Sequence, residues 1–522
     1  MSEQSDGPSA VSHRDPGRRP LLTGLLGLSA SLLAVRPALA QGTAGHHHGT
    51  GSVQPTPPAT PAPRGVPLVD PETRRSANGE LRTTLRIHYT YKDVGGFRLY
   101  MRSYDGMIPG PTLRVRPGDT LRIRLVNDLP PNRDTTPMDL SIPHHFNTTN
   151  FHFHGSHVSP EGIADNVLRV MEPGQTYDVE IPIPADHTRG TYWYHPHHHG
   201  GADVQMASGM VGAIIVEGDF AEVPEIANAV ERTLVLGQVV FDRHGMIERF
   251  ETVFPEGATR FLTVNGQREP VIQMRPGEVQ RWRLLHAGYQ DDLFLDLEQH
   301  GFTIIAFDGI ALSAMRRTDR LLMAPGQRAD ILVRGGDPGT YRLQAMPYDQ
   351  GYPSPTGLLA HLVVAGERMT MPFPTALPPG PLRTIDDAEI TNRRELVFSA
   401  RVPQTEAAAE FREFSFMIDG KLFDHDRVDQ RIILGAVEEW TIKNLHIHDH
   451  VFHIHTNPFQ VTRINGQPTE PTWRDTAVVP AMGSLTFRSR FLDYTGKFML
   501  HCHMMNHEEM GMMQLVEVVR AP

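Results

Sequence analysis

Hydrophobic and polar residues alternate in short runs along most of the chain, and turns that contain glycine separate these runs. The clearest runs cover residues 120–127, 279–285 and 438–444. Alternation with a period of two predicts half-buried strands, because successive side chains of a strand point to opposite faces of a sheet. Short strands between glycine turns predict antiparallel β-sandwiches.

The same pattern of turns and strands occurs three times. Each copy opens with a glycine turn, at residues 108–111, 264–266 and 418–420. Each copy closes with a segment that begins at a glycine, namely Gly190, Gly339 and Gly496. The first and third closing segments run into histidines, whereas the second runs into Gln344. The repeats therefore predict three domains, at residues 75–220, 221–372 and 373–522, of which the first and third bind metal and the second is a spacer.

The N-terminal segment has the features of an export signal. Arg18 and Arg19 precede an apolar stretch at 21–35, and small residues follow at 38–40. This pattern is typical of a bacterial twin-arginine leader, so residues 1–40 predict a periplasmic or secreted protein. The stretch is short for a membrane span, and an uncleaved anchor is the alternative.

Residues 41–74 are rich in Gly, Pro and His and predict a disordered linker, whose histidines at 46–48 are expected to be solvated.

The formal net charge is −11, and no basic run follows the leader, which argues against a nucleic-acid partner. No later segment predicts a membrane span. We expect a monomer.

The densest group of metal-binding side chains surrounds Cys502, near the C-terminus. Cys502 is the only cysteine, so it cannot form an internal disulfide. A thiolate with imidazoles and a weak thioether suits copper at an electron-transfer site, and Cys502, His507 and Met512 offer such groups. On a strand, His501 and His503 point to the face opposite Cys502 and can reach other metals. The alternative is a histidine-rich loop with a reactive thiol.

Three further histidine clusters have spacings that suit metal ligands. They are His152-Phe153-His154, His195-Pro196-His197 and His450-Val451-Phe452-His453-Ile454-His455. An H-x-H spacing places two imidazoles on the same face of a strand. Together with the cysteine stretch, these clusters resemble the multicopper oxidase family, in particular its three-domain bacterial laccase-like type. The resemblance covers essentially the whole chain after the leader.

The resemblance implies an all-β fold of three consecutive cupredoxin-like Greek-key β-sandwich domains that hold four coppers per chain. A type 1 copper is then expected at His450, Cys502, His507 and, as a weak axial ligand, Met512. A type 2 copper is expected at His152 and His453. Two type 3 coppers are expected, one at His154, His195 and His503 and the other at His197, His455 and His501. Val451 is a departure, since the family usually has proline there, but it removes no ligand.

The resemblance also implies a reaction. Single electrons from a phenolic or aromatic donor enter at the type 1 copper and pass through Cys502, His501 and His503 to a trinuclear cluster, where dioxygen is reduced to water. Oxygen reduction consumes protons, and Glu508 and Asp165 are candidate proton donors. Each is alternatively a solvated loop acid or a hydrogen-bond anchor for a ligand histidine.

Further histidines near the clusters are expected to support the ligands or to lie at the surface. They are His144, His145, His157, His198, His199, His446 and His448. The last two precede the type 1 ligand His450 at even spacing and could line the substrate entrance.

Two other functions stay open: a periplasmic oxidase of Cu(I) or other metal ions, and a non-catalytic relative or copper store. Cu(I) specialists of the family often carry a Met-rich insert, whereas residues 393–473 contain only Met417, which favours organic donors. The complete ligand set and the Cys502 bridge argue against a non-catalytic protein. The third repeat and residues 501–503 argue against a two-domain copper nitrite reductase.

Overall fold

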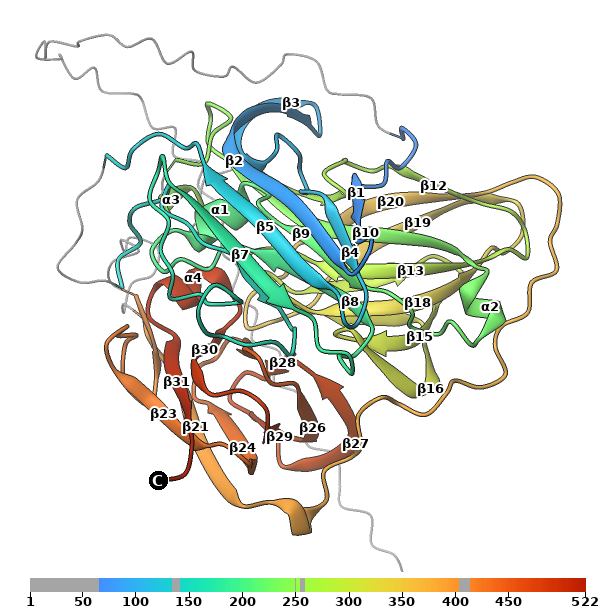
Figure 1. Cartoon of the computed structure of the whole chain (residues 1–522). Coiled ribbons are helices and arrows are strands. Elements are labelled where there is room, and N and C mark those ends of the chain that lie inside the picture. Colours follow the sequence, from blue (N-terminus) through green and yellow to red (C-terminus); the bar gives the residue numbers. More distant parts are fainter. Residues whose placement is uncertain (1–64, 134–140, 249, 254–258, 403–413) are drawn as a thin grey trace, which may run out of the picture. The chain divides into compact units, whose positions relative to one another are not determined.

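The structure is a computed structural model that describes residues 65–133, 141–248, 250–253, 259–402 and 414–522. Within these residues the chain is almost entirely β-structure, arranged in six sheets (Figure 1). The sheets form three successive sets along the sequence, which confirms the predicted all-β fold of three consecutive sandwiches. The predicted leader and the histidines at 46–48 lie outside the described residues.

The first sandwich combines a four-stranded and a five-stranded sheet. The four-stranded sheet has the order β3 (Phe97–Tyr104), β2 (Glu80–Val94), β5 (Thr120–Asn127), β7 (Thr176–Pro182). The five-stranded sheet has the order β1 (Thr73–Arg75), β4 (Thr112–Val115), β9 (Gly212–Val216), β8 (Gly190–His195), β6 (His152–His154). The fold takes in residues before the predicted boundary at 75, because β1 pairs with β4 and the Leu68 N–H donates to the Val271 carbonyl.

The second sandwich combines a six-stranded and a five-stranded sheet. The six-stranded sheet has the order β11 (Thr259–Val264), β10 (Val230–Phe241), β13 (Val279–His286), β18 (Arg328–Arg334), β15 (Phe302–Phe307), β16 (Ile310–Thr318). The five-stranded sheet has the order β12 (Val271–Met274), β20 (Gly357–Val364), β19 (Gly339–Met346), β14 (Leu293–Leu297), β17 (Arg320–Met323).

The third sandwich repeats this arrangement. Its six-stranded sheet has the order β22 (Ser415–Ile418), β21 (Asn392–Arg401), β24 (Ala436–Asn444), β29 (Ser484–Phe491), β26 (Phe459–Ile464), β27 (Gln467–Arg474). Its five-stranded sheet has the order β23 (Val428–Ile433), β31 (Met513–Val519), β30 (Gly496–Cys502), β25 (His450–Ile454), β28 (Thr476–Val479).

The helices are short. They are α1 (Ala202–Ala207), α2 (Pro224–Ala227), α3 (Phe250–Val253), the 3-10 turn η1 (Asp387–Glu389) and α4 (Met505–Glu509). Among the described residues, no helix has the length and apolar character needed to cross a membrane.

All three sandwiches share one strand-pairing scheme. The first long strand of each pairs in parallel with the strand that carries the predicted alternating run, as β2 with β5, β10 with β13 and β21 with β24. In the facing sheet, β4 pairs in parallel with β9, β12 with β20 and β23 with β31. The repeat seen in the sequence is therefore a repeat of topology.

In strand β13, the alternation of polar and apolar residues does not correspond to an alternation of exposed and buried residues. Charged and apolar residues alternate from Arg281 to Leu284, yet all eight residues of the strand are buried. Trp282 lies in the core of the second sandwich, while Arg283 on the opposite face donates to Thr191 of β8 and to Asp219. Because the first sandwich covers the charged face, polarity alternates along this strand without any exposure to water.

A shared apolar core joins the sandwiches. One buried cluster contains Trp193 from the first sandwich, Phe241 from the second and Trp440 from the third. Apolar burial of this kind is the main favourable contribution to association between domains. The sandwiches are therefore held against one another by packing as well as by ion pairs.

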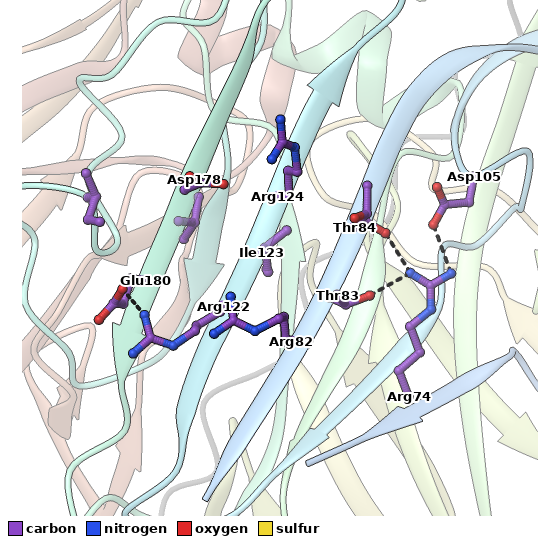
Figure 2. Close-up of a pocket in the computed structure, with 12 residues that line it drawn as sticks. Arg74, Arg82, Thr83, Thr84, Asp105, Arg122, Ile123, Arg124, Asp178 and Glu180 are labelled. Atoms are coloured by element: carbon purple, nitrogen blue, oxygen red, sulfur yellow. Dashed lines mark hydrogen bonds and ion pairs between the residues drawn. The ribbon is translucent and has the colours of Figure 1, made fainter. Parts of the chain in front are cut away.

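A hollow of about 790 Å³ lies on the first sandwich, over β2, β5 and β7 (Figure 2). Four of its charged side chains form two pairs: Arg74 donates to Asp105 over 2.9 Å, and Arg122 pairs with Glu180. We assign no ligand to this hollow.

Gly190, predicted to open the closing segment of the first repeat, lies against the backbone of Gly309 in the second sandwich, and an added Cβ would overlap the Gly309 carbonyl oxygen. Neighbouring backbone cannot move aside cheaply, so Gly190→Ala is expected to lower the free energy of unfolding by about 1–3 kcal/mol. Thermal denaturation measures the effect. The control is Gly380→Ala, whose added Cβ would meet its nearest neighbour at an ordinary 3.4 Å. Equal stability of the two variants would contradict the close approach.

Candidate metal centres

The predicted thiolate site assembles from two strands and a helix of the third sandwich. His450 begins β25, Cys502 ends β30 and His507 lies on α4. Cys502 Sγ lies 3.5 Å from His450 Nδ1 and 3.6 Å from His507 Nδ1, and the two nitrogens are 3.1 Å apart. Met512 is fully buried, and its N–H donates to the His507 carbonyl. The three donor atoms thus surround one point in a dry interior.

Six further histidines form two groups that span the first and third sandwiches. In one group, His154 Nδ1 lies 3.4 Å from His195 Nε2 and 3.2 Å from His503 Nε2. In the other, His197 Nε2 lies 3.1 Å from the Nε2 atoms of both His455 and His501. These are the two sets that the sequence predicted for the type 3 coppers.

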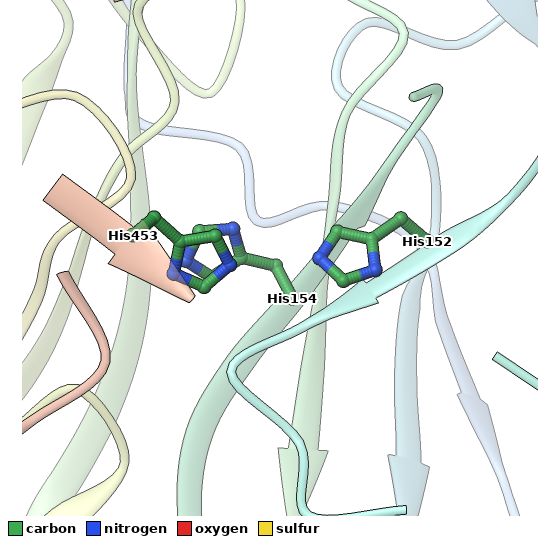
Figure 3. Close-up of side chains that lie close together, drawn as sticks. All are labelled: His152, His154 and His453. Atoms are coloured by element: carbon green, nitrogen blue, oxygen red, sulfur yellow. The ribbon is translucent and has the colours of Figure 1, made fainter. Parts of the chain in front are cut away.

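His152 and His453, the predicted type 2 pair, lie beside these groups. They form a group with His154, and the rings of His154 and His453 stack at 3.8 Å (Figure 3). The Nε2 atoms of His152 and His453 are buried and have no hydrogen-bond partner among the described residues. The predicted pair therefore lies together in the structure, and His154 is close enough to bind the same ion.

The spacing of the donor atoms fits bound metal ions. Two imidazole nitrogens bound tetrahedrally to one first-row ion at about 2.0–2.1 Å would lie about 3.3–3.4 Å apart, and a thiolate sulfur and a nitrogen about 3.6 Å apart. The observed separations fall close to these values. A buried thiolate with two imidazoles and a nearby methionine is the donor set that copper prefers.

The ionisation of the groups gives a second test of fit. Burial, and then the surrounding imidazoles, lower the pKa of His152, His154 and His453 well below the usual range, so these rings are neutral, as metal ligands must be. Burial raises the pKa of the Cys502 thiol to about 12. A bound cation is therefore needed to hold this sulfur as a thiolate.

Hydrogen bonds at the outer ring nitrogens orient the ligands. His195 Nδ1 donates to the Pro196 carbonyl over 2.8 Å, and His453 Nδ1 donates to the Asp475 carbonyl over 2.7 Å. Each of these bonds fixes the proton on the outer nitrogen and leaves the lone pair of the inner nitrogen facing the group.

Both predicted carboxylates are buried against ligand histidines. Asp165 accepts from His152 Nδ1 at 3.1 Å and from the Phe153 N–H at 2.7 Å, and burial raises its pKa to about 8. Glu508 lies 2.8 Å from His501 Nδ1 and 3.5 Å from His197 Nδ1. Burial raises the pKa of Glu508, but the imidazoles outweigh it and bring this pKa down to about 2. Neither residue is a solvated loop acid.

The additional histidines separate into three places. The rings of His446 and His448 lie 4.4 Å apart, and His446 lies 5.3 Å from the ring of His450. His157 bridges the Thr456 carbonyl and Asp493. His144, His145 and His199 surround His198, whose pKa is lowered to about 3 chiefly by burial.

Sequence reasoning missed Asp475, Thr476 and Arg328. Asp475 and Thr476 both lie within hydrogen-bond distance of His154 Nε2, and Arg328 pairs with Asp475. Asp475 follows the nearest ligand by twenty residues, and Arg328 belongs to the domain that carries no predicted ligand. Nothing in their local spacing marks them, because only the fold places them at the site.

Val451 provides a backbone donor that proline lacks. Its N–H donates to Cys502 Sγ over 3.4 Å. A hydrogen bond withdraws electron density from the sulfur, so Val451→Pro is expected to lower the potential of copper bound there. The measurement is a redox titration of the blue absorption, and Val451→Ala, which keeps the N–H, is the control. An unchanged potential in the proline variant would exclude a tuning role for this bond.

Comparisons with known proteins agree with this geometry. Models of multicopper oxidase domains match residues 88–220, 238–365 and 397–521. The multicopper oxidase mco of Staphylococcus aureus is 24% identical over 80% of this chain and 83% of its own length. The cell division protein FtsP of Escherichia coli is 24% identical over 81% of this chain and 83% of its own.

Two solved structures show the same fold. A multicopper oxidase from Campylobacter jejuni, described as a metallo-oxidase, has a TM-score of 0.73 and 24% identity, covering 89% of this chain and 98% of its own. A laccase-like multicopper oxidase from Ochrobactrum has a TM-score of 0.71 and 23% identity, covering 87% and 100%. Since the matched domain models cover most of its length, the chain belongs to the multicopper oxidase family.

Proposed function

We propose that this chain is a laccase-like oxidase that couples the oxidation of small aromatic donors to the reduction of dioxygen to water. Membership of the family makes it a copper-dependent oxidoreductase that uses dioxygen and a reductant. The observation that carries the proposal is the position of Cys502. It belongs to one donor group, while its neighbours His501 and His503 belong to two others.

We assign one copper to His450, Cys502, His507 and Met512, and three coppers to the eight remaining histidines in the sets given above. Bound copper would supply one-electron oxidation at the cysteine group and four-electron reduction of dioxygen at the histidine groups. Two peptide units connect Cys502 to His501 and His503. Few covalent bonds therefore separate the site that receives electrons from the site that uses them.

The surrounding residues keep the histidine groups dry and hold protons in place. All predicted ligands are buried. Glu508 lies 2.8 Å from His501 Nδ1 as an ion-pair partner, and Asp165 accepts the Nδ1 proton of His152, so both carboxylates act first as anchors for ligands. Their burial beside the site also places them where protons are consumed, and we retain proton delivery as a second role for both residues.

The surface beside His450 supports an aromatic donor. Leu445, Ile447 and Met482 are 60%, 62% and 66% exposed, although all three are apolar. The first two alternate with His446 and His448, and the Met482 N–H donates to the His446 carbonyl. Exposed apolar side chains gathered at one place commonly mark a binding surface. An aromatic ring would cover them while it donates an electron towards His450.

Cuprous-ion oxidation is the second candidate. The imidazoles of His446 and His448 are borderline ligands near His450, and Met482, whose N–H donates to the His446 carbonyl, carries a soft thioether. The description of the Campylobacter jejuni relative as a metallo-oxidase favours the same reading. We further propose that the protein is exported by its twin-arginine leader and works as a monomer. Its domains are those predicted at 75–220, 221–372 and 373–522, with β1 extending the first domain towards the N-terminus.

Cys502→Ser is expected to abolish the blue absorption and the oxidation of donors, because sulfur-to-copper charge transfer needs the thiolate. Copper bound by the eight histidines should remain, since those ligands are untouched. Absorption spectroscopy and copper analysis measure both. A blue, active serine variant would overturn the assignment of Cys502.

Ile447→Ser is expected to raise KM for 2,6-dimethoxyphenol about threefold to tenfold, through loss of apolar contact area. KM for Cu(I) should not change. Steady-state assays of both donors, with and without added Cu(II), make the comparison, and Ile464→Ser, at another exposed position, is the control. Efficient Cu(I) oxidation with negligible phenol oxidation would reverse the ranking of the two functions.

A further inference from the structure

An arginine of the ligand-free second sandwich reaches both of the other sandwiches. Arg328 begins β18 and is fully buried. Its NH1 and NH2 groups donate to the two carboxylate oxygens of Asp475 in the third sandwich, over 2.7 and 2.5 Å. Its Nε donates to the Thr191 carbonyl in the first sandwich over 3.0 Å. One guanidinium thus connects all three sandwiches.

The partner of Arg328 contacts two proposed metal ligands. Asp475 Oδ1 lies 3.2 Å from His154 Nε2, and the Asp475 carbonyl accepts from His453 Nδ1 over 2.7 Å. Thr476 completes the contact, because its hydroxyl lies 3.1 Å from His154 Nε2 and donates to Asp475 Oδ1 over 2.8 Å. With its Nε2 proton held in this way, His154 turns its Nδ1 towards His195 and His503.

The rest of the loop that leads to Arg328 also packs on the site. Gln327 Nε2 donates to the Thr476 carbonyl over 3.1 Å. Gly326 lies against the ring of His503, where an added Cβ would come within 3.1 Å of the imidazole. Gly155, next to His154, has a φ of +84°, and an added Cβ there would overlap Asp475 and Arg328. No side-chain atom separates the ion pair from the ligand strand at this position.

The geometry of the pair explains why an arginine stands here. Asp475 could rotate about its side-chain bonds if only one oxygen were held. The planar guanidinium binds both oxygens at once and so fixes the plane of the carboxylate. The direction of the bond to His154 follows from that plane.

We propose that Arg328 is a positioning residue of the three-copper site, which orients His154 and His453 through Asp475. This inference rests on the proposed function. It assigns the second sandwich a part in the chemistry, although that sandwich contributes no ligand. Groups that orient metal-bound histidines typically change metal affinity or activity by about tenfold to a hundredfold when they are altered.

A purely structural role is the competing explanation, and Arg283 offers a matched control. Arg283 is buried on the same sheet, pairs with Asp219 and Asp330 and contacts the Thr191 side chain. None of its hydrogen bonds or ion pairs within the described residues reaches a histidine. Replacing it therefore disturbs the contact between sandwiches but leaves the ligands alone.

The experiment compares Arg328→Lys and Asp475→Asn with Arg283→Lys in the copper-loaded full chain. For the first two variants we expect an altered electron paramagnetic resonance signal of the type 2 copper and a kcat about tenfold to a hundredfold lower. Their blue absorption and KM for 2,6-dimethoxyphenol should match the wild type, because the thiolate group is untouched. Arg283→Lys should lower Tm without changing the signal or the turnover per bound copper.

The wild type is measured first. If the wild type bound fewer than four coppers or took up no oxygen, the proposed function and this inference would both be overturned. With an active wild type, an unchanged signal and turnover in Arg328→Lys and Asp475→Asn would overturn this inference alone. Failure of both variants to fold would also count against it, since a structural role would then suffice.

Discussion

The structure must accommodate imidazole nitrogens that face one another in a dry interior, and its other features depend on this constraint. His197 Nε2 lies 3.1 Å from His501 Nε2, and both rings are buried. Neutral imidazoles whose protons sit on the outer nitrogens face one another with lone pairs, and protonation of several rings in one cavity would place like charges side by side. Bound cations would resolve this conflict, so metal binding would stabilise the contact between the first and third sandwiches at this point.

Because of that constraint, the second sandwich has to fix the relative positions of the first and third sandwiches. Metal ligands from two sandwiches must meet within a few tenths of an ångström. The second sandwich supplies buried arginines to both neighbours: Arg283 pairs with Asp219, and Arg328 pairs with Asp475. Such pairs contribute orientation more than stability, because burial of the charges offsets most of their attraction. Apolar packing provides the cohesion, and the ion pairs fix the relative positions.

Local periodicity predicted the strands and the pairs of histidines on one face, whereas the grouping of those pairs into copper sets came from the resemblance to multicopper oxidases. Alternation marks strands, and an H-x-H spacing places two imidazoles on one face. Sequence reasoning could not find Asp475 or Arg328, which meet the ligands only through long-range packing. Nor could it find β1, which begins inside the predicted linker, because this strand has too few residues to show a period and is held by pairing with β4. Strand β13 shows the same limit of prediction from sequence. Alternation identifies the two faces of a strand, but whether the polar face is exposed to water depends on the neighbouring sandwich.

The register between β25 and β30 explains why one cysteine can serve two kinds of site. Phe452 pairs with Cys502, and His453 pairs with His501. Side chains of paired residues project from the same face of a sheet, so His453 and His501 point together towards the histidine groups, while Cys502 points to the other face with His450. A slip of one residue would turn Cys502 towards the histidine groups and His501 away from them. The hydrogen bond from the His503 N–H to the Val451 carbonyl, at 2.6 Å, continues the contact beyond the last paired residues and opposes such a slip. The electron path that we propose between the two sites thus depends on strand register as much as on ligand chemistry.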